Sequence, residues 1–218
     1  MAGNPSSFTS LLKDHGIIVM HVVSSSRFAK KAEAAGCDAV IAEGFEAGGH
    51  NGREETTTMI LVPLVCEAVS IPVIAAGGIA TGRQMLAAMV LGAEGVQLGS
   101  RFVASEEASS HINFKNELVK ASEGDTILTL KEFTPVRLLK NNFYKQIQSA
   151  NERHASKNEL EQLLGKGRAR KGMFEGDLVE GELEIGQVSA LIKEIKPAAE
   201  IVEDIWLQFN EVLNTPLK

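Results

Sequence analysis

The chain has 218 residues, of which 44% are hydrophobic and 23% are charged, with a formal net charge of −6. This length suffices for a domain or a domain and a half with a sizeable core. The negative charge argues against an extended nucleic-acid or anionic-membrane surface. No signal peptide is evident, and no uncharged apolar run reaches the roughly 18 residues of a membrane span. We therefore expect a cytoplasmic protein that binds neither nucleic acid nor membrane.

The first 105 residues alternate short apolar runs, typical of buried strands, with amphipathic helices. The expected strands are Gly16–Val23, Asp38–Glu43, Pro72–Ala76 and Gly95–Leu98, and the expected helices are Ser26–Ala35, Thr58–Val69 and Gly82–Leu91. The strands lack the polar alternation of a half-exposed sheet, so helices should cover one face and a packed interior the other. Four such repeats predict an α/β fold with parallel strands.

The pattern changes after about residue 107, and we expect a second, mainly helical domain over residues 108–218. Its expected elements are a short strand at Thr126–Leu130 and helices at Asn158–Leu164, Val188–Ile195 and Ala198–Leu213. The basic run Gly165–Gly172 is expected to be a loop or a helix cap. Such a run can bind phosphate, but a solvated loop is the more common case.

Two glycine-containing loops follow consecutive strands, at Ala76–Ile79 (AGGI) and Gly99–Phe102 (GSRF). Ligands of parallel α/β folds bind beyond the carboxyl ends of the strands, where these loops meet. Glycine permits a positive φ and lets backbone N–H groups approach a phosphate. Either loop alone could be only a tight turn, but the pair favours a phosphate site.

His50 lies in a glycine-rich loop, EAGGHNG, directly after a predicted strand. An imidazole can exchange a proton near neutral pH, and the flanking glycines would let a ligand lie against the backbone. A solvated surface histidine explains the same pattern equally well, so the residues alone leave both interpretations open. The sequence shows no Ser-His-Asp set, no paired-carboxylate spacing, no metal-ligand cluster and no dinucleotide-binding glycine motif.

Five segments, taken in order, resemble one known family. They are AEGFEAGGHNG, TTTMILVP, IPVIAAGGIATG, LGAEGVQLGSRF and GRARKGMFEGDLVEGELEIGQVSALI. They resemble the nitronate monooxygenase family (formerly 2-nitropropane dioxygenase), which includes enoyl-acyl-carrier-protein reductase II. The resemblance covers most of the chain.

The resemblance implies an FMN-binding TIM (β/α)8 barrel with a helical addition. His50 matches the active-site histidine of the family, while Glu43 and Gly48 match positions beside the flavin. Gly77 and Gly78 match the glycines at the FMN phosphate. The segment that wraps this phosphate matches Gln97, Leu98, Gly99 and Ser100. Family members often have Thr in place of Ser100, and Ser keeps the hydroxyl group. No metal site is implied.

The chain departs from the family at its start, because members begin about 100 residues earlier. Its opening, MAGNP, resembles an interior segment that follows the fourth barrel strand. We therefore expect barrel strands five to eight plus the C-terminal addition. Half a barrel leaves two strand edges unpaired, so we expect marginal stability or pairing with another copy or a further fragment.

Four functions are compatible with these residues. The first, implied by the resemblance, is oxidation of alkyl nitronates with dioxygen or NAD(P)H-dependent flavin chemistry. The second, also implied by the resemblance, is reduction of an enoyl thioester by an enoyl-acyl-carrier-protein reductase II, with acyl carrier protein as partner. A third possibility is an inactive half-barrel that serves in binding or assembly. A fourth is a different phosphate-binding barrel, but the histidine of EAGGH argues against it.

Overall fold

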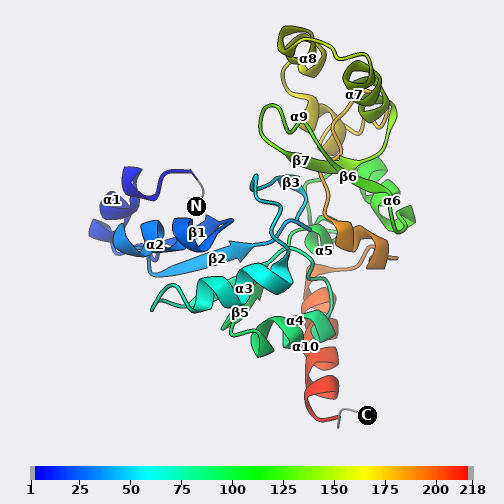
Figure 1. The fold of residues 1–218 in the computed structure, drawn as a ribbon. Coiled ribbons are helices and arrows are strands. Elements are labelled where there is room, and N and C mark those ends of the chain that lie inside the picture. The colour runs from blue at the N-terminus through cyan, green and yellow to red at the C-terminus, as the bar shows by residue number, and fades with distance from the viewer. Residues whose placement is uncertain (1–2, 216–218) are drawn as a thin grey trace. The chain divides into compact units, whose positions relative to one another are not determined.

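The computed structural model describes residues 3–215, so Met1 and Ala2 of the MAGNP segment lie outside the described residues. The chain divides into two compact units (Figure 1). Unit 2 consists of Gly48–Arg53 and Gly99–Ile201, and the remaining residues form unit 1. Both units are discontinuous in sequence, whereas the expected domains, 1–107 and 108–218, are continuous. That division into barrel and addition stays a prediction.

Unit 1 contains a four-stranded parallel sheet in the order β1-β2-β4-β5. Its strands are β1 (Met20–Val23), β2 (Ala39–Glu43), β4 (Val73–Ala76) and β5 (Gly95–Gln97). All three neighbouring pairs are parallel. The four parallel strands expected from the alternating pattern are thereby confirmed, although each is shorter than its apolar run.

Helices pack against one face of this sheet (Figure 1). They are α2 (Ser26–Ala34), α3 (Thr58–Cys66) and α4 (Gly82–Val90), preceded by a 3-10 turn, η1 (Pro5–Ser7), and α1 (Thr9–Asp14). Alternate strand residues, such as Val40 and Ala42 of β2, are fully buried in a core shared with Leu61, Val62 and Val65 of α3. The predicted helices are confirmed to within three residues at each end.

The predicted helix Ala198–Leu213 is confirmed with the same bounds as α10, which belongs to unit 1 from Val202 onward. Its backbone lies against the start of α4. A Cβ atom at Gly82 would be 2.3 Å from the carbonyl oxygen of Ile205 and from the amide nitrogen of Phe209. The Gly82 N–H also donates to the side-chain oxygen of Gln208 at 3.1 Å. Glycine is therefore required where the two helices touch.

Unit 2 contains a three-stranded antiparallel sheet in the order β3-β7-β6. The strands are β3 (Gly49–His50), β6 (Thr126–Thr129) and β7 (Val136–Leu139). The helices are α5 (Ser100–Val103), α6 (Ile112–Lys120), α7 (Asn142–Glu152), α8 (Lys157–Leu164) and α9 (Arg168–Met173), with a 3-10 helix, η2 (Gln187–Leu191). The expected strand at 126–130 and helix at 158–164 are confirmed as β6 and α8.

Two expectations for unit 2 are wrong in part. The helix expected over Val188–Ile195 is the 3-10 helix η2 followed by extended chain, because the backbone there bonds elsewhere. The Lys196 N–H donates to Ala104, and the Glu194 carbonyl accepts from Arg101. The basic run Gly165–Gly172 is not only a loop or cap, since its second half forms α9.

Among residues 3–215, no helix combines the length and apolar character needed to cross a membrane.

Replacing Gly82 by Ala tests the contact between α4 and α10. Alanine raises helix propensity, yet its methyl group would meet two backbone atoms that cannot rotate away, so we expect a loss of about 1–3 kcal/mol in the free energy of unfolding. Gly99→Ala is the matched control, because its Cβ would meet nothing within 4 Å. Urea unfolding of both variants measures the difference, and an unchanged midpoint for Gly82→Ala would rule out the close contact.

Candidate active site

The carboxyl ends of three parallel strands of unit 1 are aligned. Glu43 pairs in register with Ala76, and Ala76 pairs with Gln97. Residues in register on neighbouring parallel strands point to the same face, so the Glu43 and Gln97 side chains share a face of the sheet. Gln97 is exposed, whereas Leu98 packs partly against the core of unit 1. The glycine loops therefore begin at one edge, as the sequence predicted.

A threonine at the start of α3 holds the loop that follows β4. The Thr58 hydroxyl donates to the carbonyl of Gly77 at 2.9 Å, and its oxygen lies 2.9 Å from Oε2 of Glu46. The Glu46 carboxylate also accepts from the Thr58 N–H, which places a negative charge at the helix N-terminus where the dipole favours it. A Cβ at Gly44 would overlap Thr58, so the network depends on glycine there.

Gly77 and Gly78 both adopt the left-handed backbone region, with φ of 83° and 69°. A Cβ at Gly77 would lie 2.7 Å from the carbonyl oxygen of Gly44, so position 77 cannot carry a side chain. At Gly78 a Cβ would meet Glu46 only at an ordinary 3.5 Å. Within residues 3–215 the Gly78 N–H donates no hydrogen bond. This loop therefore offers a backbone donor in a conformation that glycine adopts readily.

Glu43 lies at the last position of β2 and is half-buried. Burial raises the pKa of its carboxyl group above the ordinary value. No described residue forms a hydrogen bond with this carboxyl group. A buried acid without a protein partner at a strand end is a typical ligand-contacting group.

In unit 2, β3 places His50 through two pairings with β7. Gly49 pairs with Arg137, and His50 pairs with Val136. The preceding residue, Gly48, packs directly on the backbone of Ile185, where a Cβ would come within 2.4 Å of the carbonyl carbon. Gly48, predicted to lie beside the flavin, thus has a structural reason to be glycine. His50 itself is exposed.

The segment Gly181–Gly186 runs beside the same β7 strand. The Leu139 N–H donates to the Leu183 carbonyl at 2.9 Å, and Leu138 forms a bridge with Glu184. Extended backbone sends alternate side chains to opposite sides. Leu183 and Ile185 are accordingly buried, while Glu182 and Glu184 are half-buried on the other side.

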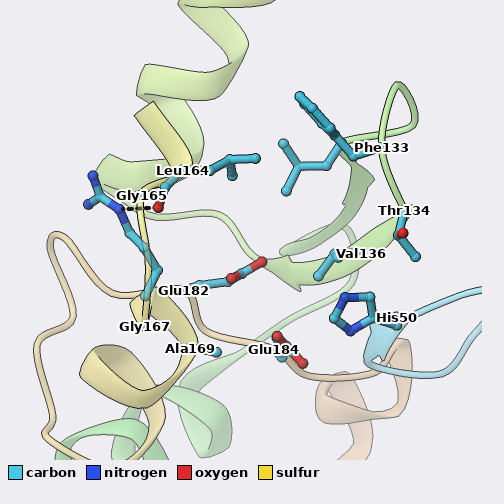
Figure 2. Close-up of a pocket in the computed structure, with 12 residues that line it drawn as sticks. His50, Phe133, Thr134, Val136, Leu164, Gly165, Gly167, Ala169, Glu182 and Glu184 are labelled. Carbon is cyan, nitrogen blue, oxygen red and sulfur yellow. Dashed lines mark hydrogen bonds between the residues drawn. The ribbon is translucent and has the colours of Figure 1, made fainter. Parts of the chain in front are cut away.

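These elements, together with the end of α8 and the start of α9, line an open cavity of about 310 Å³ within unit 2. Figure 2 shows the imidazole of His50 at one side and the carboxyl group of Glu184 next to it, with Glu182 pointing into the same space. The apolar part of the wall consists of Leu130, Phe133, Val136, Leu164 and Ala169. The cavity thus combines an apolar wall with a histidine and two carboxyl groups.

Burial and repulsion by Glu184 raise the pKa of Glu182 to about 7, against the attraction of Arg168. Burial also raises the pKa of Glu184, and His50 acts in the opposite direction. The Glu182 carboxyl group therefore keeps its proton at a pH where exposed carboxyl groups are ionised. Groups with such perturbed pKa values, gathered in a cavity, are typical of functional sites.

Arg168, the other charged residue in the cavity wall, is held by its own neighbours. Its guanidinium donates to Glu180 at 2.8 and 3.0 Å and to the carbonyls of Leu163 and Leu164. It also lies 4.6 Å from the ring centroid of Phe143. Arg168 therefore joins α8 to the segment before Gly181. Because its N–H groups are engaged in these bonds, few of them remain to bind a phosphate.

Ser100 is the first residue of the four-residue helix α5 in unit 2, and Gly99 is its N-cap. Nothing lies within 4 Å of the space that a Cβ at Gly99 would occupy. The Ser100 oxygen accepts a hydrogen bond from the Gly186 N–H at 2.9 Å. Its hydroxyl proton can therefore still be donated to a ligand.

Glu182, Glu184, Glu46 and Thr58 were not identified from the sequence. The alternation of Glu with Leu and Ile over residues 182–185 would have placed both carboxyl groups on one face of an extended segment. A two-residue spacing alone, however, does not show which strand lies opposite. In the described part of the chain, no cluster of three or more His, Cys, Asp or Glu residues could hold a metal ion.

Glu182→Gln tests the raised pKa through the stability of the protein. The folded-state pKa of about 7 exceeds the ordinary 4.5, so the stability that this proton binding contributes is present at low pH and is lost as the pH rises through 7. After discounting for partial exposure, the variant should gain about 1 kcal/mol over the natural protein between pH 5 and pH 8, or roughly 2–4 °C in Tm. Thermal melts at both pH values measure it. An equal Tm difference at both would contradict the shift.

Comparison with known proteins gives consistent results. The nitronate monooxygenase family matches residues 1–208. A probable nitronate monooxygenase of Staphylococcus saprophyticus is 35% identical over 216 residues, covering 93% of this chain and 59% of that protein. The chain thus spans about six tenths of the length of such curated relatives.

Two solved structures are similar over nearly the whole chain. FabK from Thermotoga maritima is 46% identical, with a TM-score of 0.90, over 97% of this chain and 67% of that one. A nitroalkane oxidase from Streptomyces ansochromogenes is 30% identical, with a TM-score of 0.78, over 97% and 62% of the two chains. The mixed α/β fold with its parallel sheet is that of these proteins, as the resemblance predicted. The chain belongs to the nitronate monooxygenase family.

Proposed function

We propose that this protein is an FMN-dependent oxidoreductase in which His50 is the catalytic residue. The observation that carries the proposal is the position of His50, the histidine of the GGH segment, at a cavity lined by an apolar wall and two carboxyl groups. A histidine exposed only to solvent would not need this setting. Family membership supports the flavin as cofactor.

The residues assigned to the phosphate of FMN fit that group. Gly78 has an N–H without an acceptor among residues 3–215 and no backbone contact at its Cβ position, and Gly77 leaves no room for a side chain. Dianionic phosphates are held by such backbone donors. The remaining proposed contacts are Gln97, Leu98, Gly99 and Ser100 at the phosphate, with Glu43 and Gly48 beside the flavin.

FMN, when bound, would supply the hydride and electron transfer; its electrons would come from NAD(P)H in reduction of a thioester and from the substrate itself in oxidation of a nitronate. The chain's own groups bind, orient and move protons. His50 would approach the substrate from β3 and donate a hydrogen bond or a proton to the oxygen on which negative charge develops. The apolar wall of the cavity would exclude water from that bond.

The first substrate class is an enoyl thioester, delivered by acyl carrier protein. A cavity walled by Leu130, Phe133 and Val136 suits an acyl chain better than a small polar anion. The 46% identity to FabK supports the same class. Here His50 would stabilise and protonate the enolate oxygen of the thioester while hydride reaches the β-carbon.

The second class is an alkyl nitronate oxidised with dioxygen. The family description and the curated relatives support it. His50 would then hold the nitronate anion and manage its proton. Carboxyl groups repel an anion when ionised and carry no positive charge to attract it when protonated, and Arg168 is engaged with Glu180. For this reason the enoyl thioester is the preferred candidate.

Gly78→Ala tests the phosphate assignment. The purified protein should take up FMN, and the variant should bind it at least about tenfold more weakly, because alanine disfavours the positive φ that aims the N–H. Gly36→Ala is the matched control, since Gly36 has φ 84° and open space around its Cβ position, so it carries the same backbone strain away from the site. Flavin fluorescence titration gives the affinities. Protein that takes up no FMN would support the inactive-module hypothesis, and equal affinities would refute the assignment of Gly78.

His50→Ala tests the catalytic role and the substrate class together. With FMN still bound, turnover should fall by roughly 100-fold or more, the usual size of a general acid–base contribution. NADH consumption with a crotonyl thioester is compared with oxygen uptake with an alkyl nitronate. Faster thioester turnover supports the preferred class and faster nitronate turnover the second. Undiminished turnover in the variant would remove His50 from the mechanism.

A further inference from the structure

The surroundings of His50 contain more charge than a substrate-contacting histidine requires. The titratable and charged groups in the cavity wall are His50, Arg168, Glu182 and Glu184. Arg137, on the strand paired with β3, extends to the Thr126 hydroxyl at 3.4 Å. The question is which of these groups acts on His50.

Glu184 is held beside β3 by the backbone on both sides. Its own segment is fixed to β7 by the Leu138–Glu184 bridge and by the bond from Leu139 to Leu183. A Cβ atom on Gly49 would come within 2.7 Å of the Glu184 Oε2 atom. The carboxyl group therefore occupies the space that a side chain at position 49 would take, next to His50.

Glycine at position 49 is required for two reasons. Its φ is 73°, a conformation that other residues rarely adopt, and the missing side chain admits the Glu184 carboxyl group. Both features belong to Gly49, the residue directly before His50. The GGH segment thus makes room for a carboxyl group as well as for a ligand.

Neither the Glu184 carboxyl group nor the His50 ring makes a hydrogen bond to a residue between 3 and 215. A half-buried carboxylate is costly without a partner of opposite charge. Arg168 donates hydrogen bonds to Glu180 and to the Leu163 carbonyl, and its positive charge lowers the pKa of Glu182. His50 is the group that acts on Glu184. Figure 2 shows the two side chains adjacent.

We propose that Glu184 is a positioning residue for His50: its carboxylate, when ionised, lies beside the imidazole and attracts the imidazolium, which favours one orientation of the ring. The inference deepens the proposed function and rests on it, because it gives a role to His50 as the group that supplies a proton. Glu182 lies two residues away in the same cavity, and the charge that acts on it besides Glu184 is that of Arg168, so it provides a natural comparison.

The test is an NMR titration of the His50 ring signals in the full chain, assigned by their loss in His50→Ala. In Glu184→Gln the midpoint of this titration should move to lower pH by roughly half a pH unit or more, because a partly exposed opposite charge is lost. Glu182→Gln is the matched control and should give no downward movement. Circular dichroism confirms that each variant is folded. An unmoved midpoint in Glu184→Gln overturns the proposal.

A second measurement on the natural protein keeps the inference testable if Glu184→Gln does not fold. Because interacting groups titrate together, the Glu184 carboxyl carbon signal should show a step at the midpoint of the His50 ring. Its absence overturns the proposal as well. Both readouts are independent of turnover and of FMN. A failure of the proposed function, seen as no flavin uptake, is therefore distinguishable from a failure of the pairing.

Discussion

Strand β7 is the constraint on which the histidine site depends. One edge of β7 pairs with β6. The other edge pairs first with β3 and then, further along β7, with the chain around Glu184. Residues more than 130 positions apart in sequence thereby lie next to each other. Antiparallel pairing also fixes which side chains share a face. The position of His50 beside a carboxyl group follows from backbone hydrogen bonds rather than from the side chains themselves.

The glycines of the GGH and AGGI segments have different physical reasons. Gly48 and Gly77 are required because a side chain would collide with the neighbouring backbone, whereas at Gly78 only the left-handed conformation excludes other residues. Gly77 combines both reasons, and Gly49 combines the left-handed conformation with the nearby Glu184 side chain. The distinction matters for function, since a glycine packed on backbone maintains the fold and one without such a backbone contact can serve a ligand. Gly78 is of the second kind.

Much of unit 1 was predictable from sequence, because apolar runs and amphipathic helices alternate there without conflict. Helix α10 was predicted to the residue from its apolar periodicity. Strand β7 was not, because Arg137 and Lys140 make residues 135–142 look like a charged surface segment, although Arg137 is 2% exposed. The proximity of Glu184 to His50 could not be predicted from the sequence either, since no pattern in residues 182–185 reveals that β7 lies beside them. Where local patterns and tertiary pairing disagree, as over residues 188–195, the pairing prevails.

Backbone geometry underlies both the proposed phosphate loop at Gly77 and Gly78 and the position of His50 beside Glu184. We propose that FMN is the ligand of this chain and that backbone N–H groups at Gly77 and Gly78 bind its phosphate. Amide hydrogen exchange with and without FMN tests this proposal. FMN should slow exchange at these two amides and leave β6 unchanged. Bound FMN with unaltered exchange at Gly77 and Gly78 would contradict it.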